Sequence, residues 1–395
     1  MMWMKKTIKE LDIYISDGNY SSKYPRSEEF VEEGIPFIRG NNMVDGDITD
    51  DEMYYITPEK HSILLKGHVK AGDVLITTRG NIGQVAIVPD RHEDSNINAQ
   101  IVLLRTNQKT LYNRYLLWAL QSHEVNVQYL ALQTGTALKQ LPVGKLEKLS
   151  IEVTDINKQH EIADILDKTY EVVKLRRKEL QLLDDLIKAR FVEMFGDPEL
   201  NPMGWEKVTL SDVCSSIIRG PFGSALKKEF FAEPSETTYK VYEQKHAIQK
   251  SASIGTYYIT EEKYHELKRF ECLPGDILMS CSGTMGELYQ LPEECEKGVI
   301  NQALCKFTLN DRILPICFLI YMKQTISKLE TKGSGIQNIA AVSYVKQMPI
   351  NLPPMEVQKK FERFVHQVDK SKVVVQKALE ETQLLFDSLM QQYFG

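Results

Sequence analysis

The sequence predicts an α+β fold in which two similar α/β heads are joined by two long antiparallel helices that form an intramolecular coiled coil. Two observations support this prediction. The chain repeats itself once at a spacing of about 200 residues, and each repeat ends in about 40 residues with heptad-spaced apolar side chains. The two repeats would therefore be related by a pseudo-two-fold axis.

The repeat is clearest in two glycine-rich segments. GDVLITTRGNIGQVAIVP runs over residues 72–89, and GDILMSCSGTMGELYQLP runs over residues 275–292. Asn98 and Asn301 follow them at corresponding places. The β-rich runs on either side of the inner glycines predict two strands joined by a tight turn in each head. Because shared residues serve the common fold, we expect these glycines and asparagines to support turns.

The end of each repeat predicts a long helix. Residues 157–195 contain no Pro or Gly, and apolar residues recur every seven positions, which is typical of a coiled coil. We expect Asp155 and Pro353-Pro354 to begin the helices, and Gly196 and Gly395 to end them with left-handed caps. The predicted seam consists of Leu166, Val173, Leu180, Ile187 and Met194, and of Phe361, Val365, Val368, Val375, Leu379, Phe386 and Leu389.

Lys372 and Thr382 interrupt the second seam. Because the seams of the two helices coincide under the repeat, we expect the helices to pack on each other within one chain. Two alternatives stay open from the sequence: a coiled coil between chains, or a helix that folds back on its own head.

Composition and charge limit the possible functions. The net charge is −6, residues 1–150 carry 17 basic and 19 acidic side chains, and residues 205–350 carry 17 of each. Neither head is a basic DNA clamp, so contact with DNA must come from a local patch or a partner. The longest apolar run, from Ile313, is about half a membrane span, and no secretory leader is recognisable. We expect a cytoplasmic protein without membrane association, whose six cysteines are reduced thiols.

Motifs that carry catalysis are missing from the sequence. There is no phosphate-cradling GxxxxGK[ST] loop, and the NLPPM segment at Asn351 differs from an Asn-Pro-Pro-aromatic motif through Leu352. The GNIG and GTMG segments lie between strand-like runs, so we interpret them as turns and not as RNA-binding loops. The sequence predicts no catalytic residue, no metal site and no cofactor in this chain.

The doubled order of head and helix resembles the specificity subunit of type I restriction–modification systems. The resemblance rests on GIPFIRGNNMVDGDIT, GDVLITTRGNIG, GTALKQLPVGKLEKLSIEV with NKQHEIADIL, and LPPMEVQKKF in the second repeat, and it covers nearly the whole chain. The chain differs from the usual pattern of this family at IEVTDINKQH, where the first long helix lacks the Pro-Pro that leads into the second. We therefore expect target-recognition domains at residues 1–153 and 197–352, a central helical spacer at 154–196 and a C-terminal helical spacer at 353–395.

The resemblance also implies which partners the chain has and what each of them does. It implies double-stranded DNA as the ligand, two modification subunits that methylate adenine with S-adenosylmethionine, and restriction subunits that cleave DNA with ATP and Mg²⁺. In this interpretation each head reads one half of an asymmetric, bipartite target. The helices set the spacing of the two halves and dock the modification subunits.

The candidate DNA-reading residues are polar side chains in glycine-containing loops, because Arg, Lys, Asn, Gln, Ser and Thr carry base and phosphate contacts. Those in the first head are Ser22, Lys23, Tyr24, Arg26, Arg39, Asn41, Asn42, Arg79, Asn81, Thr136, Lys139 and Gln140. Those in the second head are Arg219, Ser224, Lys227, Lys228, Gln244, Lys245, Ser282, Thr284, Ser334, Gln337 and Asn338. Residues that differ between the heads are expected to read sequence.

Three alternatives stay open from the sequence. The chain could be the specificity subunit of a different methylation-based defence system. It could be a two-headed adaptor that bridges proteins, which its net charge favours. It could also be an enzyme, such as a nuclease, whose motif is not recognisable.

Overall fold

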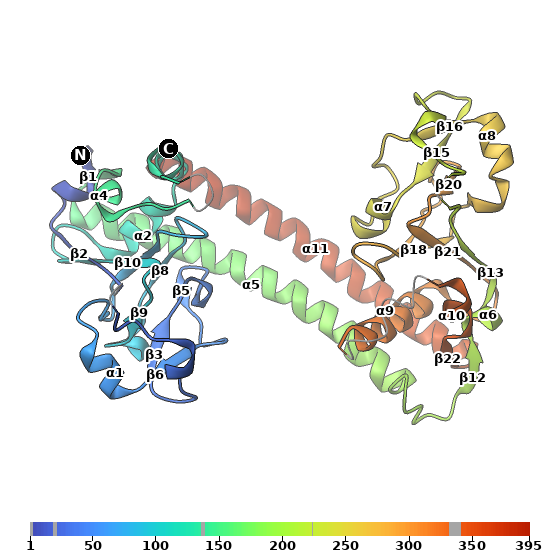
Figure 1. Ribbon diagram of the computed structural model, residues 1–395, viewed down its shortest axis with the longest axis horizontal. Helices are drawn as coiled ribbons and strands as arrows, with labels where there is room; N and C mark the ends of the chain where they lie inside the picture. The colour runs from blue at the N-terminus through green and yellow to red at the C-terminus, as the bar shows by residue number, and fades with distance from the viewer. Residues whose placement is uncertain (1–2, 19–21, 136–138, 223, 332–340) are drawn as a thin grey trace. The chain divides into compact units, whose positions relative to one another are not determined.

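The computed structural model describes residues 3–18, 22–135, 139–222, 224–331 and 341–395, which form two compact units (Figure 1). Unit 1 contains residues 1–178 and 376–395, and unit 2 contains residues 179–375. Each unit therefore holds one head and a segment of each long helix. The division of the chain at residues 153, 196 and 352 stays a prediction.

A four-stranded antiparallel sheet forms the centre of the first head. Its strands lie in the order β2 (Ile13–Asp17), β10 (Ile101–Thr106), β7 (Val74–Thr77) and β8 (Val85–Ile87). A three-stranded sheet beside it has the order β6 (Tyr54–Ile56), β3 (Ile35–Ile38) and β9 (Asn96–Ile97), with β3 and β9 parallel. The two-stranded sheets are β1 (Met4–Thr7) with β11 (Ser150–Val153), and β4 (Met43–Val44) with β5 (Asp47–Ile48).

Helix α2 (Asn113–Gln121) fills the core between the central sheet of the first head and the long helices. Its residues from Tyr115 to Leu120 are all buried, because they pack on both the sheet and the segments of the long helices in this unit. The other helices of this head are α1 (Pro58–Ile63), α3 (His123–Leu132) and α4 (Val143–Leu146).

The second head repeats this architecture. Its central sheet has the order β13 (Cys214–Arg219), β21 (Leu304–Leu309), β18 (Ile277–Ser280) and β19 (Leu288–Gln290), and β12 (Glu206–Thr209) pairs with β22 (Pro349–Leu352). A five-stranded sheet consists of β14 (Phe231–Ala232), β16 (Tyr258–Thr260), β15 (Thr238–Tyr242), β20 (Gly298–Ile300) and β17 (Glu271–Cys272), with β15 and β20 parallel. The helices are α6 (Leu210–Val213), α7 (Gln244–Ile248), α8 (Glu261–Glu266), α9 (Pro315–Thr331) and α10 (Val342–Gln347). The prediction of two similar α/β heads is confirmed.

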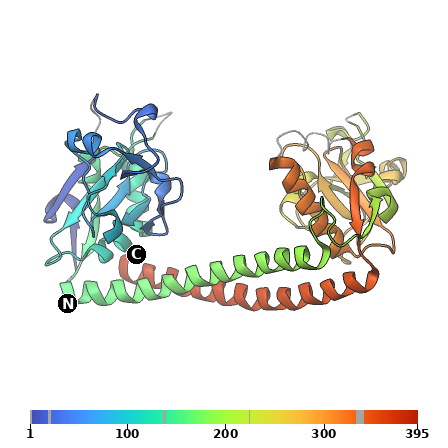
Figure 2. The ribbon, with the colours of Figure 1, turned by 90° about the horizontal axis from the view of Figure 1, so that it is seen from below.

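The two long helices are α5 (Ile156–Phe195) and α11 (Met355–Phe394), and within each unit their segments run antiparallel (Figure 2). In unit 1, the rings of Tyr170 and Phe386 lie 5.2 Å apart, and Arg177 donates a hydrogen bond of 3.0 Å to Gln383. In unit 2, the Phe191 ring lies 5.6 Å from that of Phe361. As residue numbers rise along α5, those of its partners on α11 fall. The predicted pairing of the two helices within one chain is confirmed.

The predicted seam residues are buried or half-buried. The buried ones are Leu166, Val173, Ile187, Phe361, Val365, Val368, Val375 and Phe386, and the half-buried ones are Leu180, Met194, Leu379 and Leu389. Lys372, which interrupts the second seam, forms an ion pair of 2.6 Å with Asp184 on α5. Thr382 donates its hydroxyl to the carbonyl of Ala378, one turn earlier in the same helix. Both interruptions therefore have polar partners on the helices.

The ends of the long helices follow local signals in the sequence. The Asp155 carboxylate accepts a hydrogen bond of 3.1 Å from the backbone N–H of Lys158, as an N-cap does. Helix α11 begins directly after Pro353-Pro354. Gly196 ends α5 with φ +80°, as predicted. The same prediction for Gly395 is wrong, because this terminal residue is not left-handed and only donates its N–H to Gln391.

The repeated glycines lie in turns, as predicted. Gly80 and Gly83 have φ of +73° and +87° between β7 and β8, and Gly283 and Gly286 have φ of +62° and +85° between β18 and β19. The second glycine of each pair also packs against a helix. A Cβ atom on Gly83 would lie 2.8 Å from the ring of Tyr129 in α3, whereas one on Gly80 would meet nothing within 4 Å.

This difference predicts unequal costs for two similar substitutions. Gly80→Ala carries only the penalty of a left-handed alanine, about 1 kcal/mol. Gly83→Ala adds overpacking against Tyr129 and should cost about 1–3 kcal/mol more. Amide hydrogen exchange in β7 and β8 measures both losses. Equal protection of the two variants would contradict the packing role of Gly83.

The cysteines agree with the prediction of free thiols. All six are unpaired, and only Cys295 is partly exposed. Burial raises the pKa of Cys214 and of Cys317 to about 12, so these thiols stay protonated at neutral pH. Among the described helices, none combines the length and apolar character that a membrane crossing needs.

Candidate nucleic-acid interface

In the first head, the ends of three strands bring the candidate loops together. The carboxyl ends of the parallel strands β3 and β9 meet at one edge, because Phe37 and Ile38 pair with Asn96 and Ile97. The loops that follow them, residues 39–42 and 98–100, therefore lie close together. Thr78 joins the turn after β7 to this edge. Its backbone N–H donates to the Gln100 carbonyl at 2.7 Å, and its hydroxyl donates to the same carbonyl at 3.1 Å.

The turn after β7 presents Arg79 and Asn81. Thr77 holds the turn closed through hydrogen bonds with Asn81 and Gln84, while Arg79 and Asn81 are exposed. Arg79 forms an isolated antiparallel bridge with Gln140. Gln140 is in turn bridged to Thr134 by backbone hydrogen bonds of 2.8 and 2.9 Å, and Lys139 beside it is exposed. The structure therefore brings two sequence-distant candidate loops together.

The loop after β3 divides its candidates into supporting and exposed residues. Asn42 is fully buried, accepts from the N–H of Arg39 at 3.1 Å and donates to the Asp51 carbonyl at 3.0 Å. The Arg39 guanidinium lies 3.4 Å above the Tyr54 ring and donates to the Glu52 carbonyl. Both side chains hold the loop, whereas Asn41 is exposed. Of these three candidates, Asn41 is the one placed to face a ligand.

The first candidate stretch follows β2. Gly18 is packed so closely on the Asn98 carbonyl that a Cβ atom would lie 2.2 Å from it, which ties this stretch to the same edge. Ser22, Lys23 and Arg26 are exposed. Tyr24 is half-buried, and its ring meets the edge of Phe37 at 5.7 Å.

In the second head, the same edge joins α7 to the turn after β18. The carboxyl ends of β15 and β20 meet there through the pairing of Tyr242 with Ile300. The Ser282 hydroxyl donates a hydrogen bond of 3.0 Å to Gln244 Oε1. Lys245 pairs with Glu243 at 2.7 Å, and Thr284 is exposed. Two candidates that lie far apart in the sequence, Gln244 and Ser282, are therefore in direct contact.

The remaining candidates of the second head differ in their exposure. Arg219 is half-buried and donates to the carbonyls of Gln302 at 2.8 Å and Cys281 at 3.4 Å, so it supports the fold of this edge. Ser224, Lys227 and Lys228 are exposed, and Lys227 lies 3.6 Å from Glu229. The candidates Thr136, Ser334, Gln337 and Asn338 lie outside the described residues.

The asparagines shared by the heads support turns, as predicted. Asn98 Oδ1 accepts from the N–H of Gln100, and Asn301 Oδ1 accepts from the N–H of Ala303, both at 3.0 Å. Their equivalent roles explain why the repeat keeps them. The exposed positions at which the two heads differ therefore lie beside turn-supporting residues that both heads share.

Two further pairs of supporting residues were missed by sequence reasoning. The first pair consists of Gln159 and Gln358, which are the first buried residues of α5 and α11. Each accepts a hydrogen bond from the backbone of its own head. Gln159 accepts from the N–H of Tyr112 at 2.9 Å, and Gln358 accepts from the N–H of Leu314 at 2.8 Å. Their correspondence under the repeat is the signal that could have identified them. Buried Asp73 binds Arg105 through two bonds of 2.7 Å, and buried Asp276 binds Lys306 at 3.0 Å.

Chemically, each edge presents neutral amides, hydroxyls and a few cations on rigid turns. Such groups can form hydrogen bonds with base edges and phosphates. The near-equal numbers of acidic and basic residues in each head leave little charge for phosphate binding by the head alone.

Comparison with known proteins finds a family match over both repeats. The family model described as "Type I restriction modification DNA specificity domain" matches residues 2–184 and again residues 202–382. A putative type I restriction enzyme MjaX specificity subunit from Methanocaldococcus jannaschii is 22% identical over 348 residues, covering 85% of this chain and 80% of the relative.

Two solved structures share the fold. A chain from a study of complex assembly and conformational transition of the type I R-M system has a TM-score of 0.59 at 16% identity, covering 99% of this chain and 97% of its own length. The S subunit of a type I restriction–modification system from M. genitalium has a TM-score of 0.54 at 16% identity, covering 100% of this chain and 96% of its own length.

Proposed function

The chain belongs to the family of type I restriction modification DNA specificity domains, and from this premise we propose that each head reads one half of a bipartite DNA target. The chain itself carries no catalysis; it directs methylation and cleavage by partner subunits. The observation that carries the proposal is that corresponding sheet edges in the two heads share the turn-supporting asparagines Asn98 and Asn301 and the turn glycines, and differ in their exposed polar residues. Arg79 in the first head corresponds to Ser282 in the second, and Asn41 corresponds to Lys245.

The proposed readers are the exposed or half-buried polar residues at these edges. In the first head they include Arg79, Asn81, Asn41 and Lys139, with Ser22, Lys23 and Arg26 beside them. An Arg can pair with guanine and an Asn or Gln with adenine, each with two hydrogen bonds. In the second head they include Gln244, Lys245, Ser282 and Thr284, with Lys227 and Lys228 also exposed. Because Ser282 stands where the first head has Arg79, we propose that the two heads prefer different base pairs. Two different heads on one chain would then read an asymmetric target.

The long helices are proposed to dock the modification subunits. Unit 1 exposes apolar side chains on both helices, among them Leu175 at 55%, Leu384 at 71% and Leu385 at 54% exposure. Unit 2 does the same with Leu182 at 57% and with Val373 and Val374 at 69% each. Exposed apolar patches mark protein interaction sites. One such patch in each unit supports two modification subunits, which would supply phosphate contacts as well as S-adenosylmethionine chemistry.

The restriction subunits, with their ATP and Mg²⁺, would join the same assembly. In this proposal the antiparallel pairing of α5 and α11 sets the spacing between the two halves of the target. Free cysteines and the lack of a membrane-crossing helix among the described residues are compatible with a cytoplasmic complex.

Exchange of one head tests this proposal. The first head is replaced by that of a relative with a different target, the cognate modification subunit is co-expressed, and methylated adenines are mapped in an unmethylated host. We expect one half of the methylated motif to change and the other half, with its spacing, to stay. The reciprocal exchange of the second head is the matched control. A change of both halves after either exchange would contradict independent reading by the heads.

A further inference from the structure

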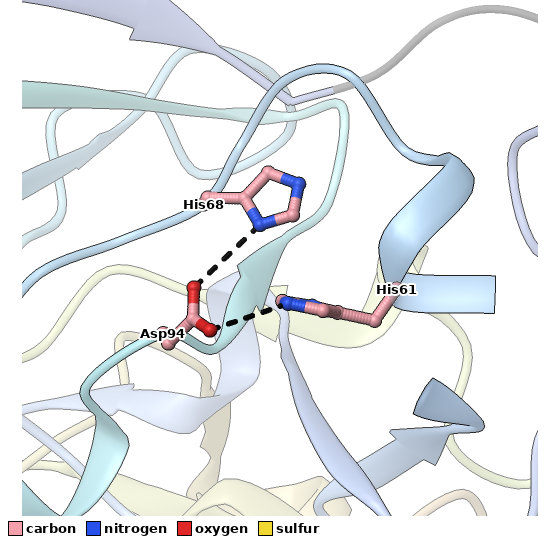
Figure 3. A group of neighbouring side chains, drawn as sticks. All are labelled: His61, His68 and Asp94. Atoms are coloured by element: carbon pink, nitrogen blue, oxygen red, sulfur yellow. Dashed lines mark ion pairs between the residues drawn. The ribbon is translucent and has the colours of Figure 1, made fainter. Parts of the chain in front are cut away.

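Three side chains with metal-binding groups meet in the first head: His61, His68 and Asp94 (Figure 3). His61 lies in α1, His68 in the loop that follows α1, and Asp94 in the turn before β9. One ligand atom from each lies within 4.8 Å of the others. The His61 and His68 rings lie edge to face, with 4.5 Å between centroids and 67° between planes, and each points one nitrogen at the Asp94 carboxylate (Figure 3).

Hydrogen bonds orient both imidazoles toward Asp94. The His68 Nε2–H donates to the backbone carbonyl of Leu64, so the lone pair of its Nδ1 faces Asp94 Oδ1 at 3.7 Å. The His61 Nδ1–H donates to Asn96 Oδ1, so the lone pair of its Nε2 faces Asp94 Oδ2 at 3.4 Å. A metal-bound histidine typically uses the N–H of its other ring nitrogen to donate a hydrogen bond to a fixed oxygen acceptor, and both imidazoles show this arrangement.

In this arrangement, two imidazole lone pairs and an acceptor-only carboxylate point at the same space. Three acceptors repel one another unless an imidazole is protonated or a cation lies between them, and a metal ion is the one partner that satisfies all three at once. Ligands held about 2.0–2.1 Å from a tetrahedral Zn²⁺ lie about 3.4 Å apart. His61 Nε2 lies 3.4 Å from Asp94 Oδ2, and His68 Nδ1 lies 3.7 Å from Asp94 Oδ1, both close to this value. All three ligand atoms lie within 4.8 Å of one another, so a small shift of the side chains closes the site around an ion.

We propose that His61, His68 and Asp94 bind a divalent transition-metal ion, with Zn²⁺ as the ion that two imidazoles and one carboxylate suit best. The Asp94 side chain is 70% exposed, so water can complete the coordination. This proposal rests on the geometry of the cluster and is independent of the proposal that the heads read DNA.

The second head provides an internal comparison. The residues at the positions of His61, His68 and Asp94 are Tyr264, Glu271 and Lys297. There the Tyr264 hydroxyl donates to Glu271, and Lys268 pairs with the same carboxylate at 2.6 Å. A direct hydrogen bond and an ion pair thus connect α8 to the residues that follow it. In the first head, the metal ion would make this connection between α1 and its following loop.

The ion would also support the candidate interface. Within the loop that carries His68, Lys66 forms an ion pair of 3.0 Å with Asp17, and Gly67 lies against Gly18. Gly18 is the last described residue before the exposed stretch that begins at Ser22. Binding of the ion would therefore hold the loop that supports the start of this stretch.

Zn²⁺ titration of the untagged full-length chain tests the proposal. The chain is first treated with a chelator, and Zn²⁺ binding is then measured by competition with a chromophoric chelator. Asp94→Asn removes the charge and keeps a residue type that tolerates the left-handed φ of +59° at this position. His68→Gln removes one imidazole at a half-exposed site. His265→Gln, which changes an exposed histidine of the second head, is the matched control.

We expect the wild type and His265→Gln to bind one Zn²⁺ per chain, and Asp94→Asn and His68→Gln to bind at least about tenfold more weakly. Zn²⁺ should also raise the thermal midpoint of the wild type but not that of Asp94→Asn. Co²⁺ should give the strong visible absorption of a tetrahedral site in the wild type and in His265→Gln, but not in Asp94→Asn or His68→Gln. No binding by the wild type, or binding that both variants retain at full strength, would overturn the proposal.

Discussion

Replacing Asp276 with alanine is expected to lower the free energy of unfolding of the second head by about 3–5 kcal/mol. Asp276 is buried and accepts hydrogen bonds from Lys306 Nζ at 3.0 Å, from the Thr308 hydroxyl at 2.5 Å and from the N–H of Leu273 at 2.8 Å. The Lys306 side chain is 8% exposed. Removing the carboxylate leaves its ammonium group buried without its counter-ion.

The first head provides the matched control for this prediction. Asp73 occupies the corresponding position, but its partner Arg105 is 29% exposed and can turn toward water. Asp73→Ala should therefore cost less than Asp276→Ala. Hydrogen exchange of β7 and β10 in one variant, and of β18 and β21 in the other, measures each head separately. A larger loss of protection in Asp73→Ala would contradict the role of burial.

The second large effect is expected from Arg79. Arg79→Ser gives the turn of the first head the residue that the second head has at Ser282, without changing the glycines that shape it. Loss of a bidentate contact from an Arg to a guanine costs about 1–3 kcal/mol, so methylation of the cognate target should fall roughly 5- to 150-fold.

The effect should be confined to one base pair in the half of the target that the first head reads. Methylation rates on a panel of targets, each with one altered base pair, measure this with the assembled methyltransferase. Lys145→Ser, at a basic position in α4 of the same head, is the control and should leave the rates unchanged. Equal loss on every target would assign Arg79 to phosphate binding and contradict base reading.

The sequence predicted the parts of the fold that depend on local patterns. Heptad spacing identified α5 and α11, and glycines between β-rich runs identified the turns at Gly80 and Gly283. The repeat also identified Asn98 and Asn301 as supporting residues. These predictions succeed because each signal can be seen in the sequence itself. The heptad period and the turn glycines involve residues close together in the chain, and the repeat relates residues at a fixed offset.

What the sequence could not provide is the environment of each polar side chain. Asn42 and Arg219 are residue types that often read DNA bases, yet their hydrogen bonds support the backbone around them. Exposed Asn41 differs from buried Asn42 only through tertiary packing. The contact between Gln244 and Ser282 likewise depends on the parallel pairing of β15 and β20. His61, His68 and Asp94 have no recognisable metal-binding spacing, because three separate segments bring them together.

The central claim is that two different heads on one chain read two halves of one target. Mapping of methylated adenines by single-molecule sequencing tests it most directly, with this chain and its cognate modification subunit co-expressed in an unmethylated host. We expect a bipartite, asymmetric motif with a fixed spacer that is lost when this chain is omitted. A continuous or palindromic motif, or no chain-dependent methylation by a demonstrably active partner, would contradict it.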